Sequence, residues 1–142
     1  MKSRPGLNRK IHSCAAQTLV EFTLVASLFL LILFATMQLT LAVLTYNSLC
    51  FAAREAARYA MVHGPNSPNP VTTAQIQQIA INAAPSLNLS ASNITVNWVA
   101  DPSLPSKQDV QVQVSYTYPI QIPFVTPVTA NFVTTSQMLV SQ

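Results

Sequence analysis

An uninterrupted apolar stretch constrains this chain more than any other feature. No Asp, Glu, Lys or Arg occurs from Phe22 to Ala53, and residues Phe22 to Phe34 are mostly Leu, Phe, Ile and Val. A helix needs about 20 such residues to cross a bilayer. Hydroxyl groups in such a helix can bond to a carbonyl one turn earlier. We therefore predict a transmembrane span over about residues 19–44, with these polar interruptions: Thr23, Ser27, Thr36, Gln38 and Thr40.

Two other interpretations of this stretch are a cleaved secretory signal and the core helix of a soluble domain. The apolar region of a secretory signal is usually about 7 to 15 residues long and precedes a cleavage site with small residues. Here the apolar run continues past Ala35 without such a site. A core helix this apolar would need a large domain around it, and the rest of the chain is small. The length favours a retained membrane anchor.

The distribution of charge predicts the orientation of the span. Four of the seven basic residues lie in the first ten positions, and cytoplasmic flanks are the ones enriched in Lys and Arg. We expect residues 1–16 to form a basic cytoplasmic tail or leader, with the C-terminal domain outside the cytoplasm. The part beyond the span is formally neutral, so the basic balance of the whole chain does not predict nucleic-acid binding.

Helical character continues beyond the apolar run. Good helix formers without Pro or Gly extend from Tyr46 to Val62, and Gly64 and Pro65 follow them. Glycine and proline at this position are typical helix stops. We predict one long helix over residues 17–63, apolar all round at first and amphipathic afterwards.

The remaining residues, 64–142, carry the pattern of a small α+β domain. Apolar residues at helical spacing predict a short helix over 73–84, capped by Thr72 or Thr73. Alternation of apolar and polar residues predicts three strands, at 93–100, 109–118 and about 130–140. The segment 101–108 suits a hairpin loop, and the proline-rich segment 119–127 a crossover. The predicted fold class is α+β: a long transmembrane helix followed by a small antiparallel sheet packed on a helix.

The chain offers few groups for catalysis. The histidines, His12 and His63, have no obvious catalytic partner, and Asp101 and Asp109 lie in or beside a predicted loop. Lone loop aspartates are more often turn residues than metal ligands. The two glycines cannot form a phosphate-binding loop. We expect no enzymatic activity, no metal and no cofactor.

Glu21 lies at the start of the apolar run. An ionised carboxylate near the edge of a bilayer costs on the order of a few kcal/mol unless it has a partner. One interpretation is that Glu21 stays hydrated in the headgroup region, about 6 Å along the helix from Gln17. The other is that it pairs with a cation of another chain.

A second candidate site is the segment AAREAARYA, residues 52–60. Alanine recurs at every fourth position from Ala52 to Ala60, a spacing that lets two helix backbones approach closely. Glu55 precedes Arg58 by one turn and can pair with it. An ordinary exposed helix could have the same composition, because Ala is the best helix former. The candidate packing residues are Ala52, Ala53, Arg54, Glu55, Ala56, Ala57, Arg58, Tyr59 and Ala60.

Three segments resemble the TadE-like family of pilus-assembly proteins: QTLVEFTLV, NSLCFAAREAARYAMV and YPIQIPFVTPVTANFVTTSQML. The resemblance spans roughly residues 15–62 and 116–140. It implies a pilin-like fold and a role as a pseudopilin or minor pilin of a tight-adherence (Tad/Flp) pilus and secretion system. The implied partners are the lipid bilayer, other pilin-like subunits, inner-membrane assembly proteins and a prepilin peptidase. The implied location is the inner membrane, single-pass, with entry into a pilus as a further expectation.

The resemblance also implies a role for Glu21. In pilin-like precursors a membrane peptidase leaves such a glutamate as the fifth residue of the mature chain, which places the cut between Ala16 and Gln17. Processed pilins usually have glycine where this chain has Ala16. After cleavage, Glu21 of one subunit would pair with the amino terminus of a neighbour. Without cleavage, Glu21 could pair with a basic group of another membrane subunit.

A function of another class also stays open. The protein could be a membrane-tethered binding or adhesion module. In that case the sheet domain would recognise a surface, a sugar or a partner protein, and the helix would only tether it.

Overall fold

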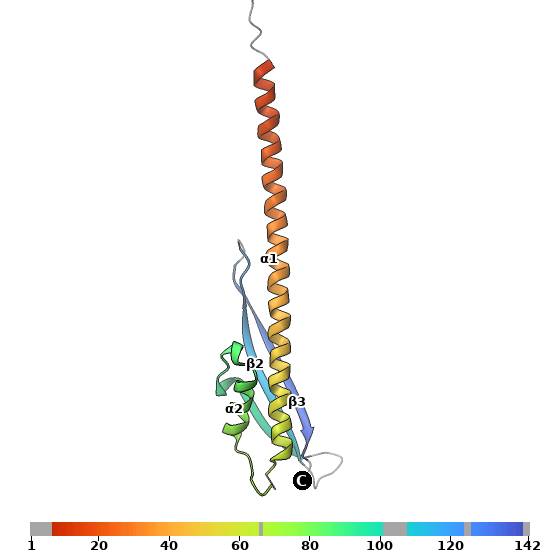
Figure 1. Cartoon of the computed structure of the whole chain (residues 1–142), viewed down its shortest axis with the longest axis vertical. Coiled ribbons are helices and arrows are strands. Elements are labelled where there is room, and N and C mark those ends of the chain that lie inside the picture. Colours follow the sequence, from red (N-terminus) through yellow and green to blue (C-terminus); the bar gives the residue numbers. More distant parts are fainter. Residues whose placement is uncertain (1–6, 66, 101–107, 124–125, 141–142) are drawn as a thin grey trace, which may run out of the picture.

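The computed structural model describes residues 7–65, 67–100, 108–123 and 126–140, with side chains from Ala16 onward. Its elements, in chain order, are α1 (Leu7–Val62), α2 (Thr73–Ala83), the short 3-10 turns η1 (Pro85–Leu87) and η2 (Ala91–Asn93), β1 (Ile94–Ala100), β2 (Gln108–Ile120) and β3 (Val128–Leu139). Figure 1 shows α1 as a long shaft, with the sheet and α2 beside its C-terminal half. The predicted α+β class, with a long apolar helix and a small antiparallel sheet, is confirmed.

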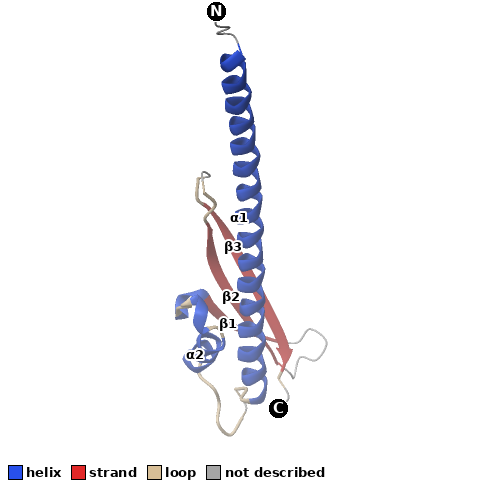
Figure 2. Ribbon diagram, turned by 45° about the horizontal axis from the view of Figure 1, so that its top comes forward, coloured by secondary structure: helices blue, strands red, loops and turns tan. Residues whose placement is uncertain are grey.

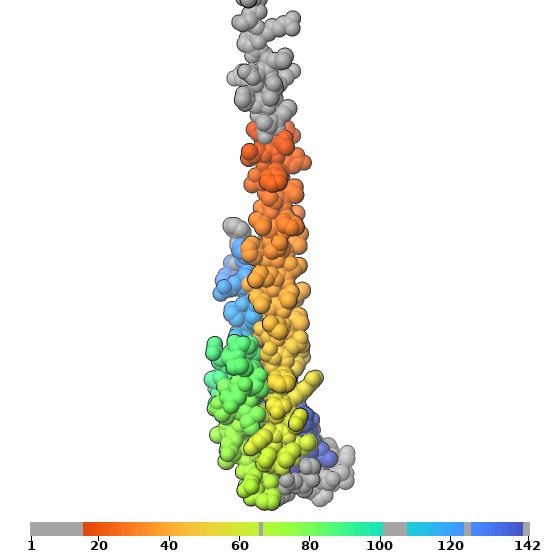
Figure 3. Space-filling view, viewed as in Figure 1, coloured from red at the N-terminus to blue at the C-terminus, as the bar shows by residue number. Residues whose placement is uncertain are grey.

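The helix α1 is longer than predicted at its N-terminal end. It begins at Leu7 rather than at residue 17, and it ends at Val62. Its 56 residues give a length of about 84 Å. In the part of the chain that the structure describes, it is the one helix long and apolar enough to cross a membrane. Figure 3 shows the red part of its described surface, nearest the N-terminus, extending beyond the domain.

The three strands form one antiparallel sheet in the order β1-β2-β3. The pairing of β1 with β2 starts at Ile94↔Val114, whereas the pairing of β2 with β3 continues to Ile120↔Val128. The last part of β2 therefore pairs with β3 alone, and the two strands run as a ribbon beside α1 (Figure 2). β2 continues two residues beyond the predicted end at 118, through Pro119. A proline is tolerated there because this part of β2 has a free edge.

The core lies between α1, α2 and one face of the sheet. Val110, Val112 and Val114 of β2 are fully buried, and they alternate with more exposed polar residues as the sequence pattern predicted. They share one buried cluster with residues of both helices: Leu49, Ala52, Ala53, Ala56, Ala57 and Ala60 from α1, and Ile76 and Ala80 from α2. Small residues on α1 let the sheet lie close to the helix axis.

The ends of both helices are held by specific contacts. Thr72 caps α2 as predicted, with its hydroxyl and the Gln75 side chain forming a capping box. Gly64 follows α1, but no described glycine has a positive φ. A Cβ on Gly64 would instead collide with the side chain of Val140. Gly64 therefore permits a close approach of the chain to the end of the sheet, rather than a left-handed turn.

Replacing Ala56 with Leu tests the close contact between helix and sheet. Because Ala56 is fully buried, the larger side chain must displace core residues, and we expect a loss of about 1–3 kcal/mol in the free energy of unfolding. Urea unfolding of the detergent-solubilised protein, followed by Trp98 fluorescence, measures this loss. Ala74→Leu is the matched control, since Ala74 is exposed on α2. Equal stability of the two variants would contradict the packing described here.

Candidate assembly surface on the long helix

The surroundings of the α1 side chains change near Gln38. Before this residue its large apolar side chains are exposed, and beyond it one side lies against the domain. The Tyr118 hydroxyl donates to Gln38 Oε1 at 3.1 Å. Counted from the N-terminus, this is the first hydrogen bond between α1 and the sheet among the described residues. Further along, Thr45 and Leu49 are buried beneath the ribbon and the domain.

The hydroxyl groups within the apolar run are all satisfied inside the helix. Thr23 donates to the Leu19 carbonyl at 2.7 Å and Ser27 to the Leu24 carbonyl at 2.8 Å. Thr36 and Thr40 make the same kind of bond, at 2.8 and 2.9 Å. The prediction that these residues would bond to the preceding turn is confirmed. They present little polar surface to lipid.

Glu21 differs from these residues because its side chain has no partner in the described part of the chain. It is exposed and lines a shallow depression with Ala16, Gln17, Val20 and Leu24. Ala16 and Gln17, the predicted cleavage pair, are exposed on the same stretch of helix. Along the axis, Glu21 lies about 26 Å from Gln38, close to the roughly 30 Å thickness of the hydrocarbon core.

The alanine-rich segment is a packing surface, but its observed partner is this chain's own domain. Ala52, Ala53, Ala56, Ala57 and Ala60 are all fully buried in the cluster shared with α2 and β2. The spacing correctly indicated a close approach of backbones. However, the face is already covered, so another subunit cannot reach it in this conformation.

The other candidate residues of this segment face outward. Arg54, Arg58 and Tyr59 are exposed and Glu55 is half-buried. Glu55 and Arg58 line one shallow depression, yet no ion pair joins them among the described side chains. Tyr59 stacks on His63 with ring centroids 4.3 Å apart. These polar groups are the part of the predicted site that remains open to a partner.

An aromatic cluster, which the sequence pattern did not reveal, joins α1 to the ribbon. Phe132 lies between Tyr46 and Tyr118, with centroid distances of 6.0 Å to each. Nearby, the Cys50 thiol lies 3.4 Å from the Thr134 hydroxyl. A side-chain hydrogen bond with Cys50 raises the pKa of the Tyr46 phenol above its ordinary value. These contacts join residues far apart in the chain, and no local periodicity could have indicated them.

The described side chains include no group of three or more His, Cys, Asp or Glu placed to hold a metal ion. Asp109 accepts a hydrogen bond from Gln137 at 2.7 Å across the sheet. His63 lies at the C-terminal end of α1, with Nδ1 3.2 Å from the Tyr59 carbonyl oxygen. Asp101 and His12 lie outside the residues whose side chains are described.

Comparison with known proteins supports the resemblance found in the sequence. Residues 16–58 match the model of a family described as TadE-like protein. The match includes the predicted cleavage pair, Glu21, the apolar run and most of the alanine-rich segment. No curated protein and no solved structure matches the chain. The family and the single candidate span indicate a single-pass membrane protein associated with a Tad pilus.

Changing Tyr118 to Phe tests the contact between the ribbon and Gln38. Loss of the hydroxyl leaves the Gln38 amide without this partner, and we expect amide hydrogen exchange at Thr117, Tyr118 and Ile120 to become about tenfold faster, equivalent to about 1.4 kcal/mol. Hydrogen–deuterium exchange with mass spectrometry measures the change. Tyr116→Phe is the control, because no described hydrogen bond involves the Tyr116 hydroxyl. Unchanged exchange in Tyr118→Phe would show that the ribbon does not depend on this bond.

Proposed function

Since residues 16–58 carry the TadE-like match, we propose that the protein is a pseudopilin or minor pilin-like component of a tight-adherence pilus assembly and secretion system. It is anchored in the inner membrane, with its C-terminal domain outside the cytoplasm. It acts through helix packing and domain contacts. One observation carries the proposal: within residues 19–44, Glu21 is the one polar side chain without a partner in the described structure.

The partner of Glu21 comes from another chain. An unpaired charge among apolar helices is costly, whereas a paired charge is tolerated. The surface around Glu21 is apolar and exposed, with Phe22 at 73% and Leu24 at 64% exposure. A bundle of such helices would remove the carboxylate from water. Its charge would then be unpaired unless an amine of a neighbouring subunit reached it. Because the amine must reach Glu21, this one ion pair would fix the axial position of each subunit relative to its neighbour.

Cleavage between Ala16 and Gln17 would supply the amine. The scissile bond lies inside α1, which begins at Leu7, so the peptidase must open a helical turn or act before it forms. Both flanking side chains are exposed. Cleavage would leave Glu21 one turn from the new amino terminus, near the edge of the bilayer.

Packing between subunits uses the apolar part of α1 rather than the alanines. Residues 52–60 contribute their small side chains to the chain's own core. The large side chains from Phe22 to Phe34 remain exposed. We propose that this surface packs on lipid in the membrane and on neighbouring helices after assembly, while the exposed Arg54, Arg58 and Tyr59 make contacts between domains.

Replacing Glu21 with Gln tests the assembly role. The substitution keeps size and polarity but removes the charge, so we expect membrane insertion to persist while the amount recovered with sheared pili falls about tenfold or more. Quantitative immunoblotting of membrane and pilus fractions measures both quantities. Asp109→Asn is the control and should assemble normally, because Asp109 lies on the sheet, paired with Gln137, outside the helix surface proposed for assembly. If Glu21→Gln also assembles normally, the helix is only a tether and the assembly role is wrong.

Mapping the N-terminus of the membrane-extracted protein tests the cleavage. We expect intact-mass measurement to show a chain that starts at Gln17, because that cut generates the amine proposed to pair with Glu21. An Ala16→Arg variant, with a large charged residue before the cut, should retain residues 1–16. A wild-type chain that retains them would rule out maturation and leave Glu21 to pair with a basic group of a different membrane protein.

A further inference from the structure

The ribbon of β2 and β3 reaches past Gln38 along α1. Its described end, called here the hairpin tip, consists of residues 120–123 and 126–128. Figures 1 and 2 both show this tip beside the middle of α1, well above α2 and β1. The domain therefore extends alongside the helix toward the segment that crosses the bilayer.

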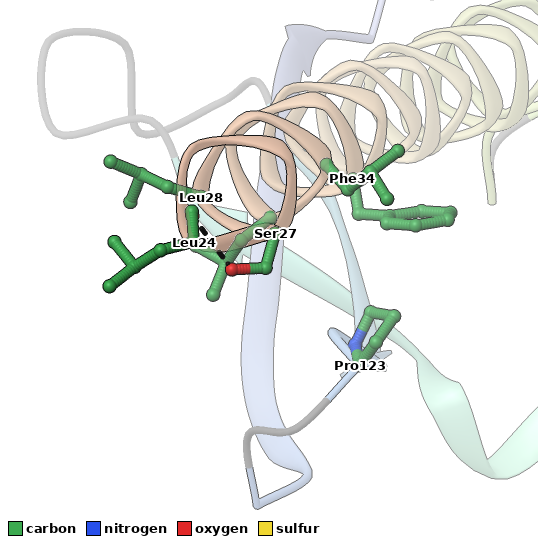
Figure 4. A pocket seen from close by; sticks show the side chains of 7 residues that line it. Leu24, Ser27, Leu28, Phe34 and Pro123 are labelled. Carbon is green, nitrogen blue, oxygen red and sulfur yellow. Dashed lines mark hydrogen bonds between the residues drawn. The ribbon is translucent and has the colours of Figure 1, made fainter. Parts of the chain in front are cut away.

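A groove separates the hairpin tip from α1. It has a volume of about 610 Å³, and its lining includes Leu24, Leu28, Leu31 and Phe34 of the helix and Pro123 of the tip. Figure 4 shows Pro123 across an open gap from the helical side chains. The polar residue of the lining, Ser27, donates its hydroxyl to the Leu24 carbonyl. The groove thus offers a ligand almost only apolar surface.

The level of this groove along α1 lies inside the membrane. A span of about 20 residues that starts anywhere from Ala16 to Glu21 ends between Ala35 and Thr40. Phe34 falls within the hydrocarbon core for every one of these placements. Leu41 and Leu44 line a second hollow together with Tyr118 and Leu87 of the domain. The outer end of the predicted span, residues 19–44, therefore lies beside the domain.

The chemistry of the ribbon suits contact with lipid at this level. No charged residue occurs from Val110 to the end of the chain. Prolines at 119, 123 and 127 lack an N–H group, so the hairpin carries fewer backbone donors that would need a partner in lipid. The described charges of the domain, on Arg54, Glu55, Arg58 and Asp109, lie at the opposite end of the helix and the ribbon.

We propose that the hairpin tip enters the leaflet on the domain's side of the membrane, and that lipid acyl chains fill the groove between the tip and α1. The groove is continuous with the exposed apolar surface of the span, which lipid already surrounds, and this continuity favours lipid over a second copy of the chain. Insertion is limited to the outer part of this leaflet, because the backbone groups on the free edge of β2 would lack partners deeper in the hydrocarbon core. Tyr118 then lies at the interface, where tyrosine is enriched. The inference requires that α1 spans a bilayer, and it does not depend on pilus assembly.

Depth-dependent fluorescence quenching tests the proposal in full-length protein reconstituted into phospholipid vesicles. Trp98, the single tryptophan, is replaced by Phe, and a new tryptophan is introduced by Val128→Trp at the tip. Val133→Trp is the matched control. Val128 and Val133 lie on β3 and are 55% and 50% exposed, and the control position is about 17 Å farther from the tip.

The expected result is that lipids brominated in the upper part of their acyl chains quench Val128→Trp about twofold or more over Val133→Trp. Lipids brominated near the chain ends should quench Val128→Trp less. Ile122→Trp, just after the end of β2, repeats the test if Val128→Trp does not fold. Equal quenching at the tip and control positions would overturn the proposal. Quenching that appears only when the protein is diluted in lipid would also overturn it, because a second copy would then occupy the groove.

Discussion

The contact between the alanines of α1 and the sheet is the interaction on which the rest of the structure depends. Small side chains at positions such as Ala53 and Ala56 let Val112 of β2 share a dry core with the helix. Burial of this kind stabilises a domain in proportion to the apolar area removed from water. Because the helix that forms this core is also the membrane helix, the domain is fixed relative to the bilayer without a flexible linker. The position of the ribbon, the groove and Tyr118 follows from that attachment.

One part of α1 faces lipid and another part packs on the domain, and the polar side chains of the two parts find hydrogen-bond partners in different ways. In the lipid part, hydroxyls bond to their own backbone, as Thr23 does. Where the helix meets the ribbon, Gln38 takes its partner from Tyr118. Glu21 has neither solution, because a carboxylate cannot donate to a carbonyl and no sheet reaches it. Among the described residues of the span, Glu21 is therefore the position at which we propose that a second molecule supplies the partner.

The sequence predicted the elements well and their contacts less well. Strict alternation in β2 identified Val110, Val112 and Val114 as the buried face, because a strand's periodicity is a local property. The alanine spacing indicated close packing, but not that the partner was the chain's own domain. The hydrogen bond between Gln38 and Tyr118 joins residues 80 positions apart, so no local pattern could predict it. The extension of β2 through Pro119 was missed because proline is tolerated only where an edge is free, and this depends on the length of β1.

Zero-length cross-linking measures the central claim, that Glu21 pairs with a cation of another chain. A lipid-soluble carbodiimide joins a carboxylate to an amine only when the two are in contact. Mass spectrometry of cross-linked membranes from mixed light and heavy isotope-labelled cells then identifies the partner chain. We expect the Glu21 peptide to be joined to an amine on a second polypeptide, with Gln17 of a neighbouring copy as the partner. If other carboxylates cross-link in the same membranes but the Glu21 peptide carries only the unconjugated carbodiimide adduct, Glu21 does not pair with an amine of another chain.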